Sequence, residues 1–264
     1  MVYIGMVIFA VWTLFPLFVM ISTSLGPNLA PLSSDRPVLS SVSPDNYIHA
    51  WNETNIPLYL RNTVIVSITS TFLSLAFGVP AAYAFARFRF RGSRFLSRWI
   101  LSIRLLPPIA FIVPFFVMFA SFHLLHKYSS LIIVYTTFLL PFSIWLLASF
   151  IHEVPFEAEE AAQVDGLSRL QVVYKIILPQ IWPAIGVVAM LNMVAAWNEF
   201  LFALTLTGAK TATLPLGVVN FIGERGVEWG HISAAAVITM IVPVIISIAI
   251  NRYLIRGLTF GTNK

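Results

Sequence analysis

The sequence predicts an all-α integral membrane protein with six transmembrane helices and a helix–turn–helix on the cytoplasmic side. Of the 264 residues, 58% are hydrophobic and 10% are charged, and the mean hydropathy is +0.86. Soluble domains carry roughly a quarter charged residues, so this composition excludes an ordinary cytosolic enzyme. The apolar residues lie in continuous runs long enough to cross a membrane as helices, and not in the short alternating segments of a β-barrel. Because cysteine is absent, a disulfide framework, a thiolate nucleophile and a cysteine-ligated metal are also excluded.

The predicted spans are residues 3–24, 63–86, 99–121, 130–151, 183–206 and 233–254, and we expect one transmembrane domain over residues 1–264. No Lys or Arg precedes the first span, which predicts a retained helix and not a signal peptide with its basic N-terminal region. The proline-rich segment 25–62 predicts an ordered loop with at most short helices. Prolines also interrupt the spans, at Pro80, Pro107, Pro108, Pro114, Pro141 and Pro243. Kinked helices of this kind either surround a translocation path or simply pack together in a bundle.

The distribution of Lys and Arg predicts the orientation, because these residues are enriched in cytoplasmic loops. One side of the spans carries Arg87, Arg89, Arg91, Arg94, Arg98, Arg169, Lys175, Arg252, Arg256 and Lys264. The other side carries only Arg36, Arg61, Lys127, Lys210 and Arg225. Both termini and the loops 87–98 and 152–182 are therefore predicted to be cytoplasmic. Arg104, inside the third span, is expected to reach toward the same face, and the Arg run of loop 87–98 to lie near anionic lipid.

The cytoplasmic loop 152–182 predicts two helices joined by a glycine turn. Pro155 suits the first turn of a helix, because the N–H that it lacks would have no partner there. The following carboxylates oppose the positive end of the helix dipole, and they are Glu157, Glu159 and Glu160. Gly166 after Asp165 predicts a left-handed stop to this first helix.

A second helix of the loop is predicted to begin at Ser168. Ser168 and Gln171 have the spacing of a capping box, in which each side chain bonds the backbone amide of the other residue. Pro179 is predicted to end this helix. One helical face carries an apolar stripe, formed by Leu170, Val173, Tyr174 and Ile177. A short, rigid element of this kind suits docking into a groove on a cytoplasmic partner.

Several motifs resemble one known family. The loop segments 160–162, 165–166 and 177–179 resemble the EAA loop of bacterial ABC importer permeases of type I. Further segments resemble the carbohydrate-uptake branch of that family, in its maltose-permease-like second subunit, and they are residues 62–63, 82–87, 197–201, 214–217, 229–230, 252–253 and 257–259. Two features depart from the branch: Asn251 stands where Gln is usual, and the tail 260–264 replaces the usual Ala-Gly-Ala-Val-Lys-Gly. The changed tail leaves open whether it reaches the ATPase dimer.

The resemblance implies a permease subunit of an ATP-driven sugar importer with the type I fold, in the bacterial inner membrane. The partners that it implies are a different second permease, two ATPase subunits, an extracytoplasmic sugar-binding protein and membrane lipid. ATP and magnesium are then held by the ATPase subunits, and this chain is expected to hold no cofactor or metal and no catalytic residue. The implied ATPase-coupling residues are Glu160, Ala161, Ala162, Asp165, Gly166, Leu178 and Pro179.

The candidate residues for a substrate path are Asn192, Trp197, Asn198 and Glu199. An ionisable residue within a span is a candidate functional group by default, which draws attention to Glu199. The alternative for Glu199 is a paired carboxylate near the outer membrane surface. Asn192 and Ser143 are more typical of hydrogen bonds between helices than of a cavity lining.

Other functions fit the sequence less well. A permease for a polyol or a glycerol-phosphate-like compound is the nearest alternative. A membrane enzyme acting on lipid-linked sugars could use the acidic segment 153–165, but no acid–base pair is visible within the spans. Nucleic-acid binding is disfavoured, because the loop 152–182 carries more acidic than basic residues. His123 and His126 lack a third ligand nearby, which favours solvated loop histidines over a metal site.

Overall fold

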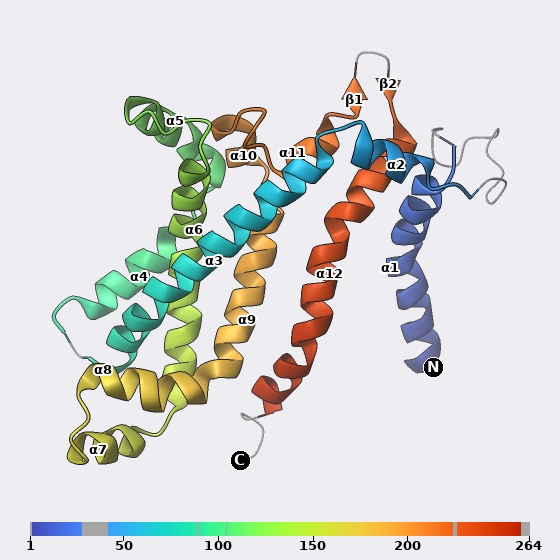
Figure 1. Cartoon of the computed structure of the whole chain (residues 1–264). Coiled ribbons are helices and arrows are strands. Elements are labelled where there is room, and N and C mark those ends of the chain that lie inside the picture. The colour runs from blue at the N-terminus through green and yellow to red at the C-terminus, as the bar shows by residue number, and fades with distance from the viewer. Residues whose placement is uncertain (1, 28–41, 89, 104, 224–225, 260–264) are drawn as a thin grey trace. The chain divides into compact units, whose positions relative to one another are not determined.

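The computed structural model describes residues 2–27, 42–88, 90–103, 105–223 and 226–259, with backbone alone from residue 250 on. The described chain is almost entirely helical (Figure 1), as the composition and the apolar runs predict. The helices are α1 (Val2–Ser24), α2 (Asp45–Asn52), α3 (Ile56–Arg87), α4 (Ser93–Ile103), α5 (Ile112–Ser121), α6 (Tyr128–Glu153), α7 (Phe156–Val164), α8 (Arg169–Val172), α9 (Leu178–Trp197), α10 (Leu201–Leu206), α11 (Leu214–Val219) and α12 (Trp229–Thr259). A 3₁₀ turn, η1 (Pro108–Phe111), and a π-helical turn, η2 (Val173–Ile177), join some of them. The short strands β1 (Ile222–Gly223) and β2 (Gly226–Val227) pair antiparallel.

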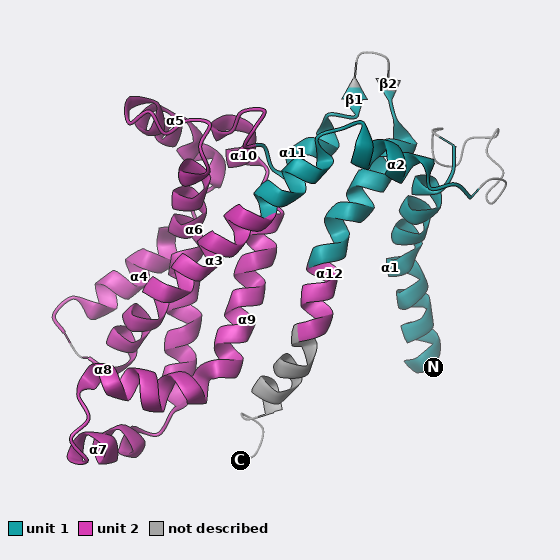
Figure 2. Cartoon of the chain, viewed as in Figure 1, with its two compact units in different colours: residues 1–63, 212–242 teal, residues 64–211, 243–264 magenta. Residues whose placement is uncertain are grey.

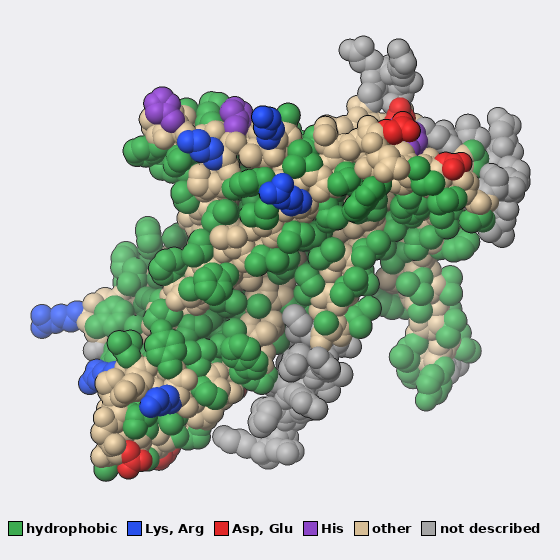
Figure 3. Space-filling view, in the orientation of Figure 1, with side chains coloured by type: hydrophobic (Ala, Val, Ile, Leu, Met, Phe, Trp, Pro, Cys, Tyr) green, Lys and Arg blue, Asp and Glu red, His purple; other side chains and the backbone are tan. Residues whose placement is uncertain are grey.

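Five helical stretches of the described chain are long and apolar enough to cross a membrane. They are Val2–Ser24, Ile56–Arg87, Tyr128–Glu153, Arg169–Trp197 and Trp229–Ala249. Hydrophobic side chains dominate the visible face of the molecule (Figure 3), and many large ones are exposed. A protein in water could not leave so much apolar surface uncovered, whereas helices in contact with lipid can.

The third predicted span, residues 99–121, is not one straight helix. The stretch consists of α4 followed by η1 and α5, and the two parts are bent by 95° with respect to each other. The bend falls at the Pro107-Pro108 pair, where Pro107 has an extended backbone (φ −65°, ψ 127°). A residue that precedes proline is disfavoured in the α conformation, so the helix stops there. Counted as one bent span, this pair raises the total to six. Arg104 lies outside the described residues, as do Arg36, Arg89, Arg225 and the tail 260–264.

Two helices also differ in extent from the predicted spans. The helix α3 already starts at Ile56, before the predicted span that begins at residue 63, and it takes in the end of the proline-rich segment. The fifth predicted span, 183–206, is divided, since α9 ends at Trp197 and a separate short helix, α10, begins at Leu201. The proline-rich segment otherwise contains the short helix α2, as expected.

The described chain forms two compact units (Figure 2), residues 1–63 with 212–242 and residues 64–211 with 243–264. In the first unit, two of the family-like motifs contact each other. The side chain of Asn62 donates to the carbonyl of Ala212 (2.8 Å), and the amide of Leu214 donates to Oγ1 of Thr63 (2.8 Å). These bonds fix the start of α11 to α3, and all four residues are buried.

The second unit contains α6 and α9 packed side by side, with two apolar clusters. One cluster joins α3 and α6 to α7, η2 and α9, and Leu147 and Ile177 are fully buried in it. The other cluster joins α5, α6 and α10, where Phe119 and Phe202 are buried. The first cluster therefore connects the loop 152–182 directly with three membrane helices.

A buried polar contact also crosses the second unit. The hydroxyls of Ser74 on α3 and Ser143 on α6 lie 2.7 Å apart, and the side-chain amide of Asn192 on α9 donates to both of them (3.2 Å and 2.7 Å). None of these side chains is more than 1% exposed. Because water does not compete for these bonds in an apolar interior, they hold the three helices in one arrangement.

Candidate coupling site

The first helix of the loop 152–182 is α7, which begins directly after Pro155 as the sequence predicts. Gly166 follows the helix with φ +88°, the left-handed conformation expected there. The amide of Gly166 donates to the carbonyl of Gln163, and the amide of Leu167 donates to that of Ala162 (both 3.0 Å). The turn thus satisfies the last carbonyls of α7 in a conformation that glycine adopts without steric cost.

The second helix begins at Ser168 with the predicted capping box. The amide of Gln171 donates to Oγ of Ser168 (3.4 Å), and the amide of Ser168 donates to Oε1 of Gln171 (2.8 Å). The predicted apolar stripe is divided, however. Val173 and Ile177 are buried, whereas Leu170 and Tyr174 are 69% and 66% exposed.

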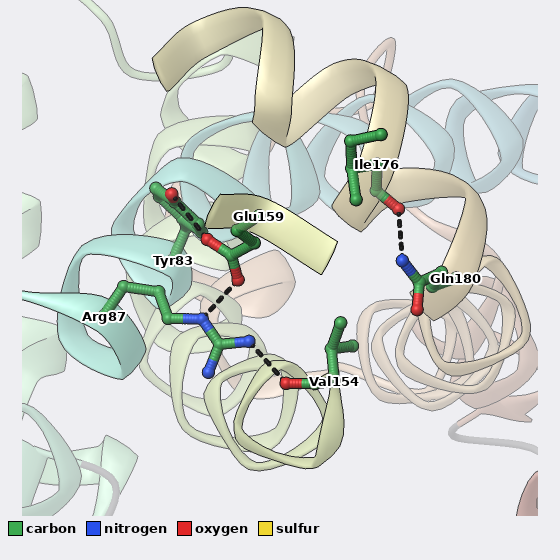
Figure 4. A network of polar contacts seen from close by, with 6 residues as sticks. All are labelled: Tyr83, Arg87, Val154, Glu159, Ile176 and Gln180. Carbon is green, nitrogen blue, oxygen red and sulfur yellow. Dashed lines mark hydrogen bonds and ion pairs between the residues drawn. The ribbon is translucent and has the colours of Figure 1, made fainter. Parts of the chain in front are cut away.

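The prediction that Pro179 ends this helix is wrong. The chain passes through η2, where the amide of Leu178 bonds the carbonyl of Val173, one residue further back than in an α-helix. The side chain of Gln180 donates to the carbonyl of Ile176 (3.1 Å; Figure 4). A π-helical turn is a common way to accommodate a residue without N–H inside a helix. The loop and the fifth span consequently form one helical stretch of 29 residues.

The predicted coupling residues differ in their exposure. Glu160, Ala161, Asp165 and Gly166 are exposed on α7 and its turn. Ala162 faces inward and is buried, in the apolar cluster that contains α7. Leu178 and Pro179 belong to the start of α9. The exposed part of the coupling set therefore lies on α7 and its turn, and the apolar Val164 at the end of α7 is also highly exposed.

The inner face of α7 is fixed by a buried ion pair that the sequence did not indicate (Figure 4). Glu159 is completely buried and accepts hydrogen bonds from Nε of Arg87 and from the hydroxyl of Tyr83 (2.9 Å), both on α3. Nη2 of Arg87 also donates to the carbonyl of Val154, between α6 and α7 (2.7 Å). The guanidinium lies 5.7 Å from the centre of the Phe156 ring. These contacts join α7, α3 and the end of α6 at one point.

Of the candidate path residues, three have local roles within the described structure. Asn192 is buried in the polar contact with Ser74 and Ser143. Trp197 is buried at the end of α9, and Asn198 is exposed with its side chain donating back to Val194 (2.9 Å). Their part in a substrate path is still a prediction.

Glu199 both caps a helix and lines a cavity. Its carboxylate oxygens accept the amides of Phe202 (3.0 Å) and Ala203 (3.3 Å) at the start of α10. A carboxylate at a helix N-terminus is favoured by the helix dipole. Glu199 also lines a cavity of about 220 Å³ together with Tyr135 and Phe138. A carboxylate has more acceptor positions than these two amides use, so it can still accept a bond from a ligand hydroxyl.

Replacing Asn192 by Ala is expected to destabilise the protein by about 1–2 kcal/mol, because the two serines lose their common donor. Thermal unfolding of the detergent-purified protein measures this loss. Asn198→Ala is the matched control, since it removes an exposed side chain with one bond inside its own helix. Equal unfolding temperatures for the two variants would contradict the interhelical role of Asn192. A loss of transport without loss of stability would instead favour its role in the path.

The two predicted loop histidines lie in the turn between α5 and α6. His123 and His126 both have positive φ angles, +54° and +61°. The amide of His126 donates to the carbonyl of Leu206 (2.9 Å), which fixes this turn to the end of α10. In the part of the chain that the structure describes, no three His, Asp or Glu side chains are grouped for a metal ion.

Relatives named as sugar permeases match nearly the whole chain. A trehalose/maltose transport system permease protein, MalG, of Thermococcus litoralis is 33% identical over 99% of this chain and 95% of its own length. The trehalose transport system permease protein SugB of Mycobacterium tuberculosis is 32% identical over 96% of this chain and 93% of its own length. Among solved structures, a chain of a bacterial ABC transporter for import of the acidic polysaccharide alginate has a TM-score of 0.80. The two sequences are 24% identical, and the match covers 95% of the present chain and 93% of the transporter chain. This similarity shows the fold.

The family model described as the inner membrane component of binding-protein-dependent transport systems matches residues 74–260. The matched region includes the loop with α7 and α8, the polar contact of Asn192 and the cavity of Glu199. Both the family and the relatives are transport permeases, which separates this chain from the membrane enzymes considered above. The chain belongs to the family of inner membrane components of binding-protein-dependent transport systems, as an ABC transporter permease.

Proposed function

We propose that this permease carries a sugar or oligosaccharide into the cell, driven by ATP hydrolysis in separate ATPase subunits. The observation that carries the proposal is the construction of α7, which is exposed on one face and fixed to the membrane helices on the other. When a partner bound to the exposed face moves, such a helix can transmit that movement to the membrane helices. Relatives named for trehalose or maltose transport support a sugar as the substrate.

In this proposal, α7 and its turn occupy a groove of an ATPase subunit. Glu160 and Asp165 supply charge to that contact, and Ala161 allows a close approach of the two backbones. ATP and magnesium bind between the ATPase subunits, and closure of those subunits displaces α7. ATP shifts the population of the transporter only because it binds the closed state more tightly than the open one.

Two connections would carry this displacement into the membrane. The ion pair of Glu159 with Arg87 connects α7 to α3. The continuous helix through η2 connects the loop to α9, which leads toward the cavity of Glu199. The path would then open alternately to the two sides of the membrane, as in transporters generally. We assign Glu199 to this path, with Asn192, Trp197 and Asn198 shaping the end of α9.

The proposed assembly contains a different second permease, two ATPase subunits and an extracytoplasmic sugar-binding protein. A solved structure of 16% identity and TM-score 0.72 is described as an alginate ABC transporter in complex with an alginate pentasaccharide-bound periplasmic protein. We place the chain in the bacterial inner membrane as a single permease domain. The excess of Lys and Arg in loops 87–98 and 152–182 supports a cytoplasmic location for both loops and both termini.

Co-purification tests this proposal. The tagged chain is extracted from native membranes in a mild detergent, and its partners are identified by mass spectrometry. We expect a nucleotide-binding ATPase and a second permease, neither of which should accompany an unrelated tagged inner-membrane protein. Repeated recovery of the chain without an ATPase would contradict the proposal. A co-recovered binding protein can be tested by thermal shift with neutral oligosaccharides, polyols and glycerol phosphate, and a response to the last two alone would contradict a sugar substrate.

Replacing Glu159 by Gln is expected to lower both stability and coupling, because Arg87 is left buried without its counter-charge. Breaking one side of a buried ion pair costs on the order of 3 kcal/mol. Thermal unfolding and the amount of substrate transported per ATP hydrolysed measure the two effects. Glu157→Gln is the matched control, since Glu157 is exposed on the same helix. If both variants behave as the wild type does, the ion pair has no part in coupling.

A further inference from the structure

A second cavity, of about 350 Å³, lies between α4 and α6, where the end of α3 contributes one side chain. Both polar and apolar side chains line this cavity. The polar residues are Ser93, Arg94, Ser97, Arg98, Ser149 and His152. The apolar residues are Phe85, Ile144, Trp145 and Ala148. The cavity therefore combines hydrogen-bond donors and positive charge with an apolar wall, as a site for an amphiphile requires.

The positive charge in this cavity is not neutralised by the described chain. Arg94 and Arg98 are four residues apart, so they lie on one face of α4, and both line the cavity. Among the described residues, the ion pairs of the structure involve Arg87, His49 and His231, and none involves Arg94 or Arg98. Two guanidinium groups on the same helical face repel each other, and an anion between them would remove that repulsion.

Large apolar side chains next to the basic residues of α4 are uncovered. Phe95 and Trp99 are 73% and 54% exposed. Arg94 and Arg98 are exposed as well as lining the cavity, so a ligand can reach both guanidinium groups from outside. The exposed rings of Phe95 and Trp99 can be covered by the hydrocarbon of a membrane.

We propose that this cavity binds the phosphate of an anionic phospholipid. Arg94 and Arg98 donate charge-assisted hydrogen bonds to the phosphate, and the hydroxyls of Ser93, Ser97 and Ser149 complete its coordination. Trp145 and Ile144 contact the glycerol backbone and the first methylene groups. A lipid is favoured over free phosphate because the apolar wall of the cavity and the exposed Phe95 and Trp99 of α4 suit a ligand that carries acyl chains. The inference does not depend on the transported solute.

Lipid titration of the purified transport complex tests this site. Native mass spectrometry compares binding of dioleoylphosphatidylglycerol with that of dioleoylphosphatidylcholine, at low salt and at about 0.5 M salt, where diffuse surface attraction is screened. We expect the wild type to prefer the anionic lipid at both salt concentrations. Arg94→Gln and Arg98→Gln should each weaken its binding about tenfold or more, the usual effect of losing a charged hydrogen bond.

Arg91→Gln is the matched control, because Arg91 is an exposed Arg of the same loop that does not line the cavity. At about 0.5 M salt this variant should bind the anionic lipid as the wild type does. Ser149→Phe fills the cavity but keeps every charge, and it should also lose the lipid. Equal losses in Arg91→Gln and Arg94→Gln, or full binding in Ser149→Phe, would overturn the site. Binding of inorganic phosphate as tight as that of the lipid would show a site for a soluble anion and would overturn the lipid assignment.

Discussion

Replacing Gly166 by Val is expected to remove most of the transport activity while the protein still inserts into the membrane. Gly166 has φ +88°, and a Cβ built on it meets no other atom within 4 Å, so any penalty arises from the backbone itself. A residue with Cβ loses roughly 1–2 kcal/mol in the left-handed conformation, and a β-branched residue loses more. We expect the turn to rearrange, α7 to lose its angle to α8, and uptake per inserted molecule to fall at least about tenfold. Uptake normalised to the amount of protein in the membrane measures the effect.

Gly92 supplies a matched control for this experiment. Its φ is +86°, and a Cβ at this position also meets nothing within 4 Å. It lies in the turn before α4, outside the loop 152–182. Gly92→Val should therefore be equally strained and still transport, and Gly166→Asn should retain much of the activity because Asn tolerates a positive φ. Normal transport in Gly166→Val, or the same loss in Gly92→Val, would contradict a special role of the coupling turn.

Replacing Gly217 by Ala should destabilise the protein by overpacking its interior. Gly217 is buried on α11, and a Cβ there would overlap the ring of Tyr59 on α3, which is itself buried. The side chain of Ile56 lies 3.4 Å from the same point, which leaves the ring little space to move. Overpacking of this kind costs about 1–3 kcal/mol. A lowered unfolding temperature of the detergent-purified protein is the expected result.

The same substitution at Gly186 should act in the opposite direction. Gly186 lies within α9, and a Cβ at this position meets nothing within 4 Å. Alanine favours a helix interior over glycine by roughly 0.5–1 kcal/mol. Gly186→Ala should thus leave the unfolding temperature unchanged or raise it. If Gly217→Ala is as stable as Gly186→Ala, then α11 does not pack against Tyr59 as described.

The spans were predictable from the sequence because the length of an apolar run decides whether a helix can cross a membrane. The sequence mispredicts helix continuity at two prolines, because the effect of a proline depends on the groups around it. At Pro107-Pro108 the chain bends instead of continuing as one span. At Pro179 the opposite holds, because the π-helical turn η2 and the side chain of Gln180 allow the helix to continue. The sequence marks both places as prolines but does not specify which neighbouring groups compensate for the missing N–H.

The coupling site was predictable only in its local parts. The left-handed turn at Gly166 and the capping box of Ser168 involve residues within a few positions of each other, so their spacing indicates them. The ion pair of Glu159 with Arg87 joins residues 72 positions apart. Glu159 and Glu160 are adjacent carboxylates in the sequence, and which of them faces inward depends on the distant Arg87 and Tyr83. The sequence marks Arg87 only as one Arg of a basic loop and as the end of the family-like segment 82–87.

Site-specific photo-cross-linking tests the central claim, that α7 seats in an ATPase subunit. A benzophenone amino acid replaces the exposed Ala161 on α7, and in a control it replaces Phe77, an exposed residue in the middle of α3. Irradiation of native membranes should link the chain to the ATPase from position 161 and not from position 77. An ATPase that co-purifies with the chain but is linked from neither position, or equally from both, would contradict the claim.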